Sequence, residues 1–402
     1  MMKITLSNVI KAGLLALISF SAIANSDHHK SAISVNAGRA PSAAFDHKGT
    51  LWVAFVHEQF VYLSSSADKG LKYSSPVRVN KQPQNIYSDG ENRPKIALAS
   101  NGYIYLSWSE KTSGRFNGDI HFTRSIDGGS SFQAVKTINT DGQNIGHRFD
   151  TLLLTPAGEI YIAWLDKRLS VQSKKSSQPY RGSSVFYSVS TDQGNSFSNN
   201  LLAADHSCEC CRMAIAPSSQ HDAVIMWRQI FEGGVRDHAI SRLFQQQAST
   251  PYRATVDQWK TDACPHHGPS LSPAFDDRYH MTWFSHGEQH KGLYYARFDF
   301  KSEAHSKAVL IDDSPSASHS FVKQVGDKTW ITWMSFQHGR SQLNMQSSSD
   351  QGHHWSAPRV ITTTFGEPDH PMIIAHQQQA YITWFTADEG LRLFPLTKQV
   401  QP

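Results

Sequence analysis

Residues 160–165 read IYIAWL, an apolar run built around Trp164 that recurs with variations along this chain of 402 residues. The related segments are residues 51–56 (LWVAFV), 104–109 (IYLSWS), 223–228 (AVIMWR), 279–284 (YHMTWF), 329–334 (TWITWM) and 380–385 (AYITWF). When aligned, they place one aromatic residue in a single register: Phe55, Trp108, Trp164, Trp227, Trp283, Trp333 and Trp384. The spacings between these residues are 53, 56, 63, 56, 50 and 51. A repeat of this length is typical of one four-stranded blade of a β-propeller.

The first repeat shows what one blade contains. Short apolar or alternating runs at residues 42–45, 51–56, 60–64 and 76–80 predict four strands, separated by turns rich in Gly, Asp and Ser. Aromatic residues make up 11% of the chain, which suits an all-β fold with a large core. We therefore predict a seven-bladed β-propeller, formed by a single domain over residues 25–402.

A turn of eight residues recurs in phase with the aromatic register. Its pattern, S-x-D-x-G-x-x-aromatic, occurs at residues 66–73 (SADKGLKY), 125–132 (SIDGGSSF), 190–197 (STDQGNSF) and 348–355 (SSDQGHHW). The Asp can accept hydrogen bonds from turn amides, and the Gly supplies a positive φ. We expect these four aspartates to hold turns together, and they are not our catalytic candidates.

On these repeats and turns the chain resembles the Asp-box (BNR-repeat) superfamily, which includes the sialidases. The resemblance covers nearly all of residues 31–397. Sialidases resemble six-bladed propellers, so a six-bladed ring with one repeat outside it is the alternative. The seventh repeat lacks a fourth strand, and residues 32–36 (AISVN) resemble residues 76–80 (PVRVN). We predict that this N-terminal strand closes the last blade and removes an open sheet edge.

The N-terminus has the pattern of a secretory signal peptide. Lys3 and Lys11 flank the start, residues 12–23 are apolar, and an A-x-A site ends at Ala24. The apolar run is too short to span a membrane, so we expect cleavage of residues 1–24 near Ala24 and export to the periplasm. No later segment predicts a membrane span. Removing these two lysines lowers the formal charge from +4 to +2, which does not favour nucleic acid as a partner.

In a propeller, the loops that enter the inner strand of each blade converge on one mouth of the central channel. The chain is rich in histidine, with 21 residues, and several lie in these loops. The loops also carry four arginines and four cysteines. His147, His319 and His370 could add metal ligands at the same mouth.

All four cysteines fall in the loops that open the fourth and fifth repeats. They stand in Cys208-Glu209-Cys210-Cys211 and in Cys264-Pro265-His266-His267. Thiolate and imidazole are the ligands that copper(I) and zinc prefer. We therefore predict a copper or zinc site whose candidate ligands are Cys208, Cys210, Cys211, Cys264, His266 and His267.

The motifs C-x-C-C-R and C-P-H resemble those of a bacterial exported subset of the same superfamily, a resemblance that implies no particular chemistry. The alternative is structural. Exported proteins favour disulfides, and an even number of cysteines permits them. One bridge from the loop of residues 208–211 to Cys264 would join two blades.

The resemblance to sialidases implies a glycoside hydrolase with three substrate-binding arginines, an Asp acid/base and a Tyr nucleophile. Residues 38–41 (GRAP) match only the Arg and Pro of the F-R-I-P motif. Arg39, Arg93, Arg148 and Arg212 are the candidates for the anion-binding arginines, and Asp150 is the candidate acid/base or the partner of Arg148. The Asp expected after the next strand is absent. Glu58 would have to replace it, and Tyr180 is the only loosely placed nucleophile.

Three functions follow from these motifs. The first is an exported metal-binding propeller, and the second is a hydrolase of sialidase type that uses the arginine-lined mouth. The third is a non-catalytic scaffold that binds a periplasmic protein. The expected partners are a metal ion or a small anion, and whether the protein is an enzyme is left open.

Overall fold

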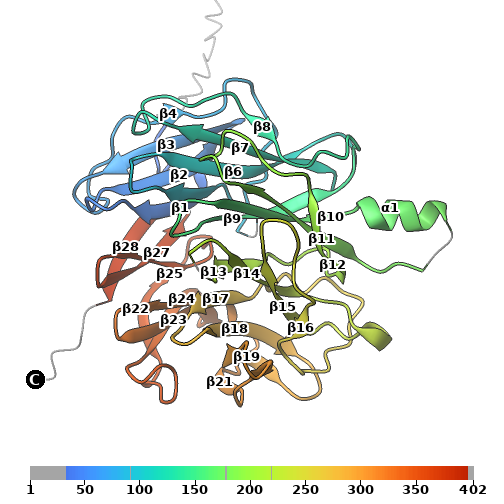
Figure 1. The fold of residues 1–402 in the computed structure, drawn as a ribbon. Helices are drawn as coiled ribbons and strands as arrows, with labels where there is room; N and C mark the ends of the chain where they lie inside the picture. Colours follow the sequence, from blue (N-terminus) through green and yellow to red (C-terminus); the bar gives the residue numbers. More distant parts are fainter. Residues whose placement is uncertain (1–32, 91, 177–178, 219, 397–402) are drawn as a thin grey trace, which may run out of the picture. The chain divides into compact units, whose positions relative to one another are not determined.

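The computed structural model describes residues 33–90, 92–176, 179–218 and 220–396. The predicted signal peptide lies outside these residues. The strands form seven small antiparallel sheets that follow one another in chain order (Figure 1). Each inner strand packs against the inner strand of the next sheet, and β26 of the last sheet packs against β1 of the first. The ring is closed, and the prediction of a seven-bladed propeller rather than a six-bladed one is confirmed.

Each blade consists of consecutive strands. The first three blades are β1 (Arg39–Phe45), β2 (Leu51–His57), β3 (Phe60–Ser66), β4 (Val77–Arg78); β5 (Lys95–Leu98), β6 (Ile104–Lys111), β7 (Gly118–Ser125), β8 (Lys136–Thr137); and β9 (His147–Leu154), β10 (Ile160–Asp166), β11 (Ser183–Ser190), β12 (Leu201–Ser207). The next two are β13 (Ala214–Pro217), β14 (Ala223–Arg228), β15 (His238–Leu243), β16 (Tyr252–Arg253); and β17 (Ser270–Pro273), β18 (Arg278–His286), β19 (Lys291–Asp299), β20 (Ala304–His305), β21 (Val309–Asp312). The last two are β22 (Ser318–Val325), β23 (Lys328–Gln337), β24 (Arg340–Ser348), β25 (Arg359–Thr364); and β26 (Met372–His376), β27 (Gln379–Thr386), β28 (Gly390–Leu396).

The aromatic register lies in the second strand of every blade, where each ring is at most 1% exposed. Each of the six tryptophans donates its indole N–H to an oxygen acceptor, so burial leaves no indole nitrogen unsatisfied. Trp164, for example, donates to Asp166 at 2.8 Å. The rings therefore fill the space between blades and also anchor the loops beside them.

The four recurring turns share one hydrogen-bond pattern. In the turn of blade three, the Ser190 hydroxyl donates to Asp192 Oδ1 at 2.8 Å and accepts from the Gly194 amide at 2.8 Å. Asp192 Oδ1 also accepts from the Ser196 amide at 2.8 Å. The turns at Asp68, Asp127 and Asp350 repeat these three bonds. The structural role expected of these aspartates matches this geometry.

The seventh blade differs from the prediction. Its sheet has three strands in the described residues, and residues 33–36 are not a strand. Asn36 Oδ1 nevertheless accepts the Leu391 amide of β28, as Asn80 Oδ1 accepts the Val61 amide of β3. Val35 is buried in the same hydrophobic cluster as Leu391. The N-terminal segment thus covers the edge by one side-chain cap and one apolar contact, without the predicted strand pairing.

The only α-helix among the described residues is α1 (Arg168–Lys175), in the insertion between β10 and β11. No helix in the described part of the chain is long and apolar enough to cross a membrane.

Candidate metal centre

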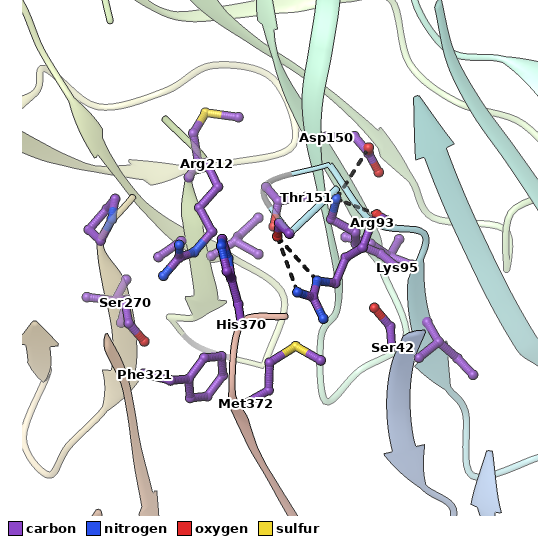
Figure 2. Close-up of a pocket in the computed structure, with 18 of the residues that line it drawn as sticks. Ser42, Arg93, Lys95, Asp150, Thr151, Arg212, Ser270, Phe321, His370 and Met372 are labelled. Carbon is purple, nitrogen blue, oxygen red and sulfur yellow. Dashed lines mark hydrogen bonds and ion pairs between the residues drawn. The ribbon is translucent and has the colours of Figure 1, made fainter. Parts of the chain in front are cut away.

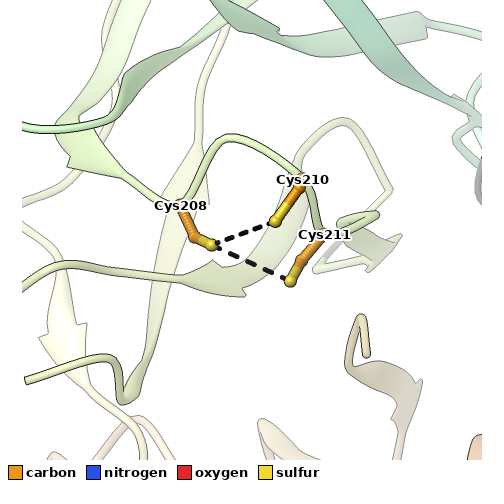
Figure 3. Close-up of side chains that lie close together, drawn as sticks. All are labelled: Cys208, Cys210 and Cys211. Atoms are coloured by element: carbon orange, nitrogen blue, oxygen red, sulfur yellow. Dashed lines mark hydrogen bonds between the residues drawn. The ribbon is translucent and has the colours of Figure 1, made fainter. Parts of the chain in front are cut away.

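The loop that joins β12 to β13 gathers three cysteines in the core between blades three and four. Cys208, Cys210 and Cys211 are between 1% and 4% exposed. The Sγ of Cys208 lies 3.7 Å from that of Cys210 and 3.9 Å from that of Cys211 (Figure 3). A disulfide would place two sulfurs about 2.0 Å apart. Zinc–sulfur bonds of about 2.3 Å in a tetrahedral site place neighbouring sulfurs about 3.8 Å apart. The observed spacing is too long for a disulfide, and it would suit sulfur ligands of one metal ion.

Positive charge surrounds this sulfur cluster. Arg236 Nη1 donates to Cys208 Sγ at 3.2 Å. Hydrogen bonds from Cys210 and Cys211, together with Arg228 and Arg236, hold the pKa of Cys208 far below its ordinary value. Interaction with Cys208 and burial raise the pKa of Cys210 and Cys211. One thiolate is therefore already stabilised, and a bound cation would favour deprotonation of the other two.

A second group of ligands extends the cluster towards the surface. The side-chain ligand atoms of Cys210, Cys264 and His266 all lie within 4.8 Å of one another. Cys264 and His266 are exposed, whereas Cys210 is buried. Cys210 belongs to both groups, so the two loops predicted to share a site do meet. All four cysteines are free thiols in the structure.

His267 lies apart from both groups. Its ring stacks on Phe284 with centroids 4.2 Å apart and lies 5.5 Å from the ring of His319. The ring of His319 in turn stacks on that of His370, with centroids 3.6 Å apart. Burial and nearby arginines lower the pKa of His267 to about 4 and that of His319 to about 2, so these imidazoles are neutral. The expectation that His267 joins the cysteines is not supported by this placement.

The inner strands enclose a separate cavity of about 360 Å³ in the central channel. Every blade contributes to its lining, which includes the basic residues Arg93, Lys95, Arg212, Lys323 and His370. Figure 2 shows four of them, Arg93, Lys95, Arg212 and His370, around the cavity. Asp150 is its one carboxylate among the described residues, and no described tyrosine or glutamate lines it. Burial lowers the pKa of Lys95, an effect that Asp150 partly offsets, and burial lowers the pKa of Lys323. The cavity is therefore one in which an anion would be stabilised.

The predicted arginine ring is only half assembled. Arg93 and Arg212 line the cavity, but Arg93 is bound to Asp369 at 2.6 Å and donates to the Pro41 carbonyl at 3.0 Å. Arg39 is exposed and does not line the cavity. Arg148 lines a different pocket, where it packs 5.0 Å from the ring of Phe116.

Asp150 does not pair with Arg148, which corrects one expectation. Its oxygens accept from the hydroxyls of Ser107 and Ser109 at 2.7 and 2.8 Å, and Lys95 Nζ lies 3.5 Å away. The reason is a bulge in β9: Phe149 has a φ of 58°, and strand pairing shifts between Ala163 and Leu165.

The remaining candidates for hydrolase chemistry lie elsewhere. The Tyr180 hydroxyl forms a hydrogen bond of 2.8 Å with the Ser184 hydroxyl, and its ring stacks on that of His206. Tyr180 does not line the cavity. Glu58 is exposed in the turn between β2 and β3 and is absent as well. Sequence reasoning missed Arg236, Lys95 and Lys323, because nothing local marks them: only the fold brings them to the sulfur cluster or the channel.

No protein-family model matches this chain, and no curated protein matches it in sequence. Solved structures share its fold. The Hadza microbial sialidase Hz136 aligns with a TM-score of 0.51 and 13% identity over 90% of this chain and 66% of its own. The polysaccharide lyase Uly1 aligns with a TM-score of 0.53 and 9% identity over 90% of each chain. A PL25 ulvan lyase aligns with a TM-score of 0.50 and 12% identity over 92% of this chain and 98% of its own. At these sequence identities, the structural similarity establishes a sialidase-like propeller fold and does not assign an activity to this chain.

Proposed function

We propose that this protein is an exported metal-binding β-propeller whose centre is the cluster of Cys208, Cys210 and Cys211. The observation that carries the proposal is the sulfur spacing of 3.7 and 3.9 Å among three buried thiols. Burying three polarisable donors around one point has a physical reason if a cation binds all of them. Cys264 and His266 extend the centre to the surface, where a metal could enter or pass to a partner protein.

The donor set favours a soft or borderline ion. Thiolates select copper(I) and zinc over hard cations. Arg236 stabilises the thiolate of Cys208 from outside the ligand set, as outer hydrogen bonds do in metal sites. We propose copper first, because the predicted signal peptide directs the chain to the periplasm, and zinc as the second ion.

Metal loading of single cysteine variants tests the proposal. The protein, purified without an affinity His-tag, is incubated under reducing conditions with copper(I) or zinc alone, and the retained metal is measured by mass spectrometry. In the copper(I) arm, wild-type protein should keep one equivalent and Cys210→Ser should keep none. Cys264→Ser should keep it because Cys264 is outside the buried triad. A native protein that retains neither metal and carries a Cys210–Cys264 disulfide would refute the proposal.

A second candidate function is the binding of an anionic ligand, such as an acidic sugar, in the central channel. It rests on the excess of Lys95, Arg212 and Lys323 over Asp150 in a cavity of about 360 Å³, where Arg93 is already paired with Asp369. The sialidases and polysaccharide lyases that share the fold make glycans the natural first probes. The sialidase mechanism itself gains no support, since the described lining offers neither a tyrosine nor a glutamate.

This second function is tested with acidic sugars rather than metals. Sialic acid and glucuronic acid should each be titrated into the protein by calorimetry, and turnover of a fluorogenic sialoside should be followed in parallel. Binding that weakens tenfold or more in Lys323→Met, with copper loading unchanged, would support a channel site. Absence of binding by both sugars would remove this candidate for these ligands.

A further inference from the structure

A second cluster of possible metal ligands lies between blades two and three. His147 begins β9 and Asp166 ends β10, and the two residues are partners across these antiparallel strands. Asp141 comes from the loop after β8 of blade two. The ligand atoms of these three side chains all lie within 4.8 Å of one another. The cluster was not predicted, because the sequence suggested that His147 would face the channel mouth.

The cluster is buried but incompletely bonded. His147 and Asp166 are fully buried, and the Asp141 side chain is 7% exposed. His147 Nε2 lies 3.1 Å from Asp141 Oδ1 and 3.7 Å from Asp166 Oδ2. Even so, Nε2 and both oxygens of Asp141 have no hydrogen bond of acceptable geometry within the described part of the chain. Buried polar atoms in that state call for a cause, such as a bound ion.

The orientation of the imidazole supports this interpretation. His147 Nδ1 lies 2.8 Å from the Gly118 carbonyl oxygen, which only accepts hydrogen bonds, so Nδ1 carries a proton. Nε2 is then the atom that faces Asp141 and Asp166. Histidines that bind metals are held in this way, with the second ring nitrogen donating to a carbonyl or carboxylate.

The balance of charge favours a cation. Asp119 lies 3.6 Å from His147 Nδ1 and adds a third carboxylate. Arg168 pairs with Asp166 at 2.7 Å and lies 3.9 Å from Asp141. Burial opposes protonation of His147, but Asp119, Asp141 and Asp166 together raise its pKa to about 9. Three carboxylates against a guanidinium and a protonated imidazole leave one negative charge in a largely buried space, and with a neutral imidazole they leave two. Such charges are costly unless they are paired or bind a metal.

We propose that Asp141, His147 and Asp166 bind a divalent cation that prefers nitrogen and oxygen ligands, such as manganese. Asp141 and Nε2 of His147 supply the open ligand atoms. Asp166 is held in place by Arg168 and by the indole N–H of Trp164 at 2.8 Å. The ion would join the loop of blade two to the first strands of blade three. This site shares no residue with the cysteine centre and differs from it in ligand chemistry.

The test uses Mn²⁺ alone, because a hard ion does not compete well for thiolates. Free Mn²⁺ is followed by electron paramagnetic resonance during titration of the intact protein. Wild type and Cys210→Ser should each bind one equivalent. Asp141→Asn and His147→Gln should weaken binding at least tenfold. His221→Gln is the matched control, because the exposed His221 of blade four pairs with Glu159 of blade three, and this variant should bind Mn²⁺ normally.

Two outcomes would overturn the proposal. One is an absence of saturable Mn²⁺ binding in the wild type, which would leave a proton on His147 as the charge that the carboxylates attract. The other is unchanged binding in Asp141→Asn. Circular dichroism of each variant without metal separates lost ligands from lost folding, and the isosteric Asp141→Asn change should preserve the fold.

Discussion

The recurring aspartate turns and the cysteine loop are of similar length. They differ in the partners that their polar side-chain atoms bind. In each turn, Asp Oδ1 accepts one hydroxyl and one amide two and four residues away, as at Asp192. In the cysteine loop, the Cys208 sulfur lies 3.7 Å and 3.9 Å from the other two, and Arg236 from the loop between β14 and β15 donates to it. The first arrangement is complete by itself, whereas we propose that a cation completes the second. What recurs in this propeller is structural, and what occurs once is the candidate for function.

The largest expected effect separates the two regions directly. Cys208→Ser should weaken copper(I) or zinc binding at least a hundredfold, because a neutral hydroxyl replaces a stabilised thiolate in a set of only a few ligands. Asp192→Asn should leave affinity unchanged, since its turn does not contact the sulfur cluster. Competition titration against a chelator of known affinity measures both. Equal losses in the two variants would contradict the distinction.

The amide caps of the outer edges offer a comparison within the repeated structure. Asn80 is buried and makes bonds to the Val61 amide and to the carbonyls of Gln59 and Gln82. Asn80→Ala should therefore lower the free energy of unfolding by about 2 kcal/mol. Asn36 is exposed, and its side chain accepts a hydrogen bond only from the Leu391 amide among the described contacts. Asn36→Ala should therefore lower the free energy of unfolding by about 0.5 kcal/mol. Chemical denaturation checks both, and a larger loss at Asn36 would mean that ring closure depends on this cap.

Arg236 tests whether the surroundings of the sulfur cluster contribute to binding. Arg236→Gln removes the charged donor to Cys208 Sγ and should weaken metal binding about tenfold, as loss of an outer hydrogen bond does in other metal sites. Arg297→Gln is the control, since Arg297 of blade five bonds to His353 of blade six at an exposed contact. The same chelator competition applies. Unchanged affinity in Arg236→Gln would confine the centre to its sulfur and nitrogen ligands.

The turns should respond to the loss of one charge by a small amount. Asp192→Asn should reduce the free energy of unfolding by about 1 kcal/mol, because the carboxylate accepts several hydrogen bonds but is exposed to solvent. Thermal unfolding of metal-free protein measures the change. A loss as large as that of a buried core residue would give this turn a role beyond its own loop.

The same turn should show a defined dependence on pH. Burial opposes ionisation of Asp192, but hydrogen bonds from Ser196 and Ser190 outweigh it and lower the pKa to about 2. An aspartate in an unfolded chain has a pKa of about 3.9. The stabilisation by Asp192 is thus fully present above that value and is lost as the pH falls towards 2. The difference in unfolding free energy between wild type and Asp192→Asn should shrink between pH 5 and pH 2.

Much of the fold was predictable from local pattern. The register of Trp108, Trp164 and their equivalents predicted the second strand of each blade, because the same buried position recurs once per repeat. The turn at Asp192 was predictable because all its bonds lie within six residues. A strand of residues 32–36 was predicted to pair with the last blade. The described residues 33–36 form no strand, and Asn36 caps the edge instead.

The sequence alone determined the number of blades, the structural turns and the approach of the two cysteine loops, since these depend on periodicity and on the order of neighbouring repeats. Only the tertiary structure decided which polar residues meet. It placed Arg236 on Cys208, separated His267 from the cysteines, and turned His147 towards Asp141 and Asp166. A bulge at Phe149 directs the side chain of Asp150 towards Lys95 rather than towards Arg148. Such partners come from distant strands and loops, and small changes in backbone direction decide which of them lie within bonding distance.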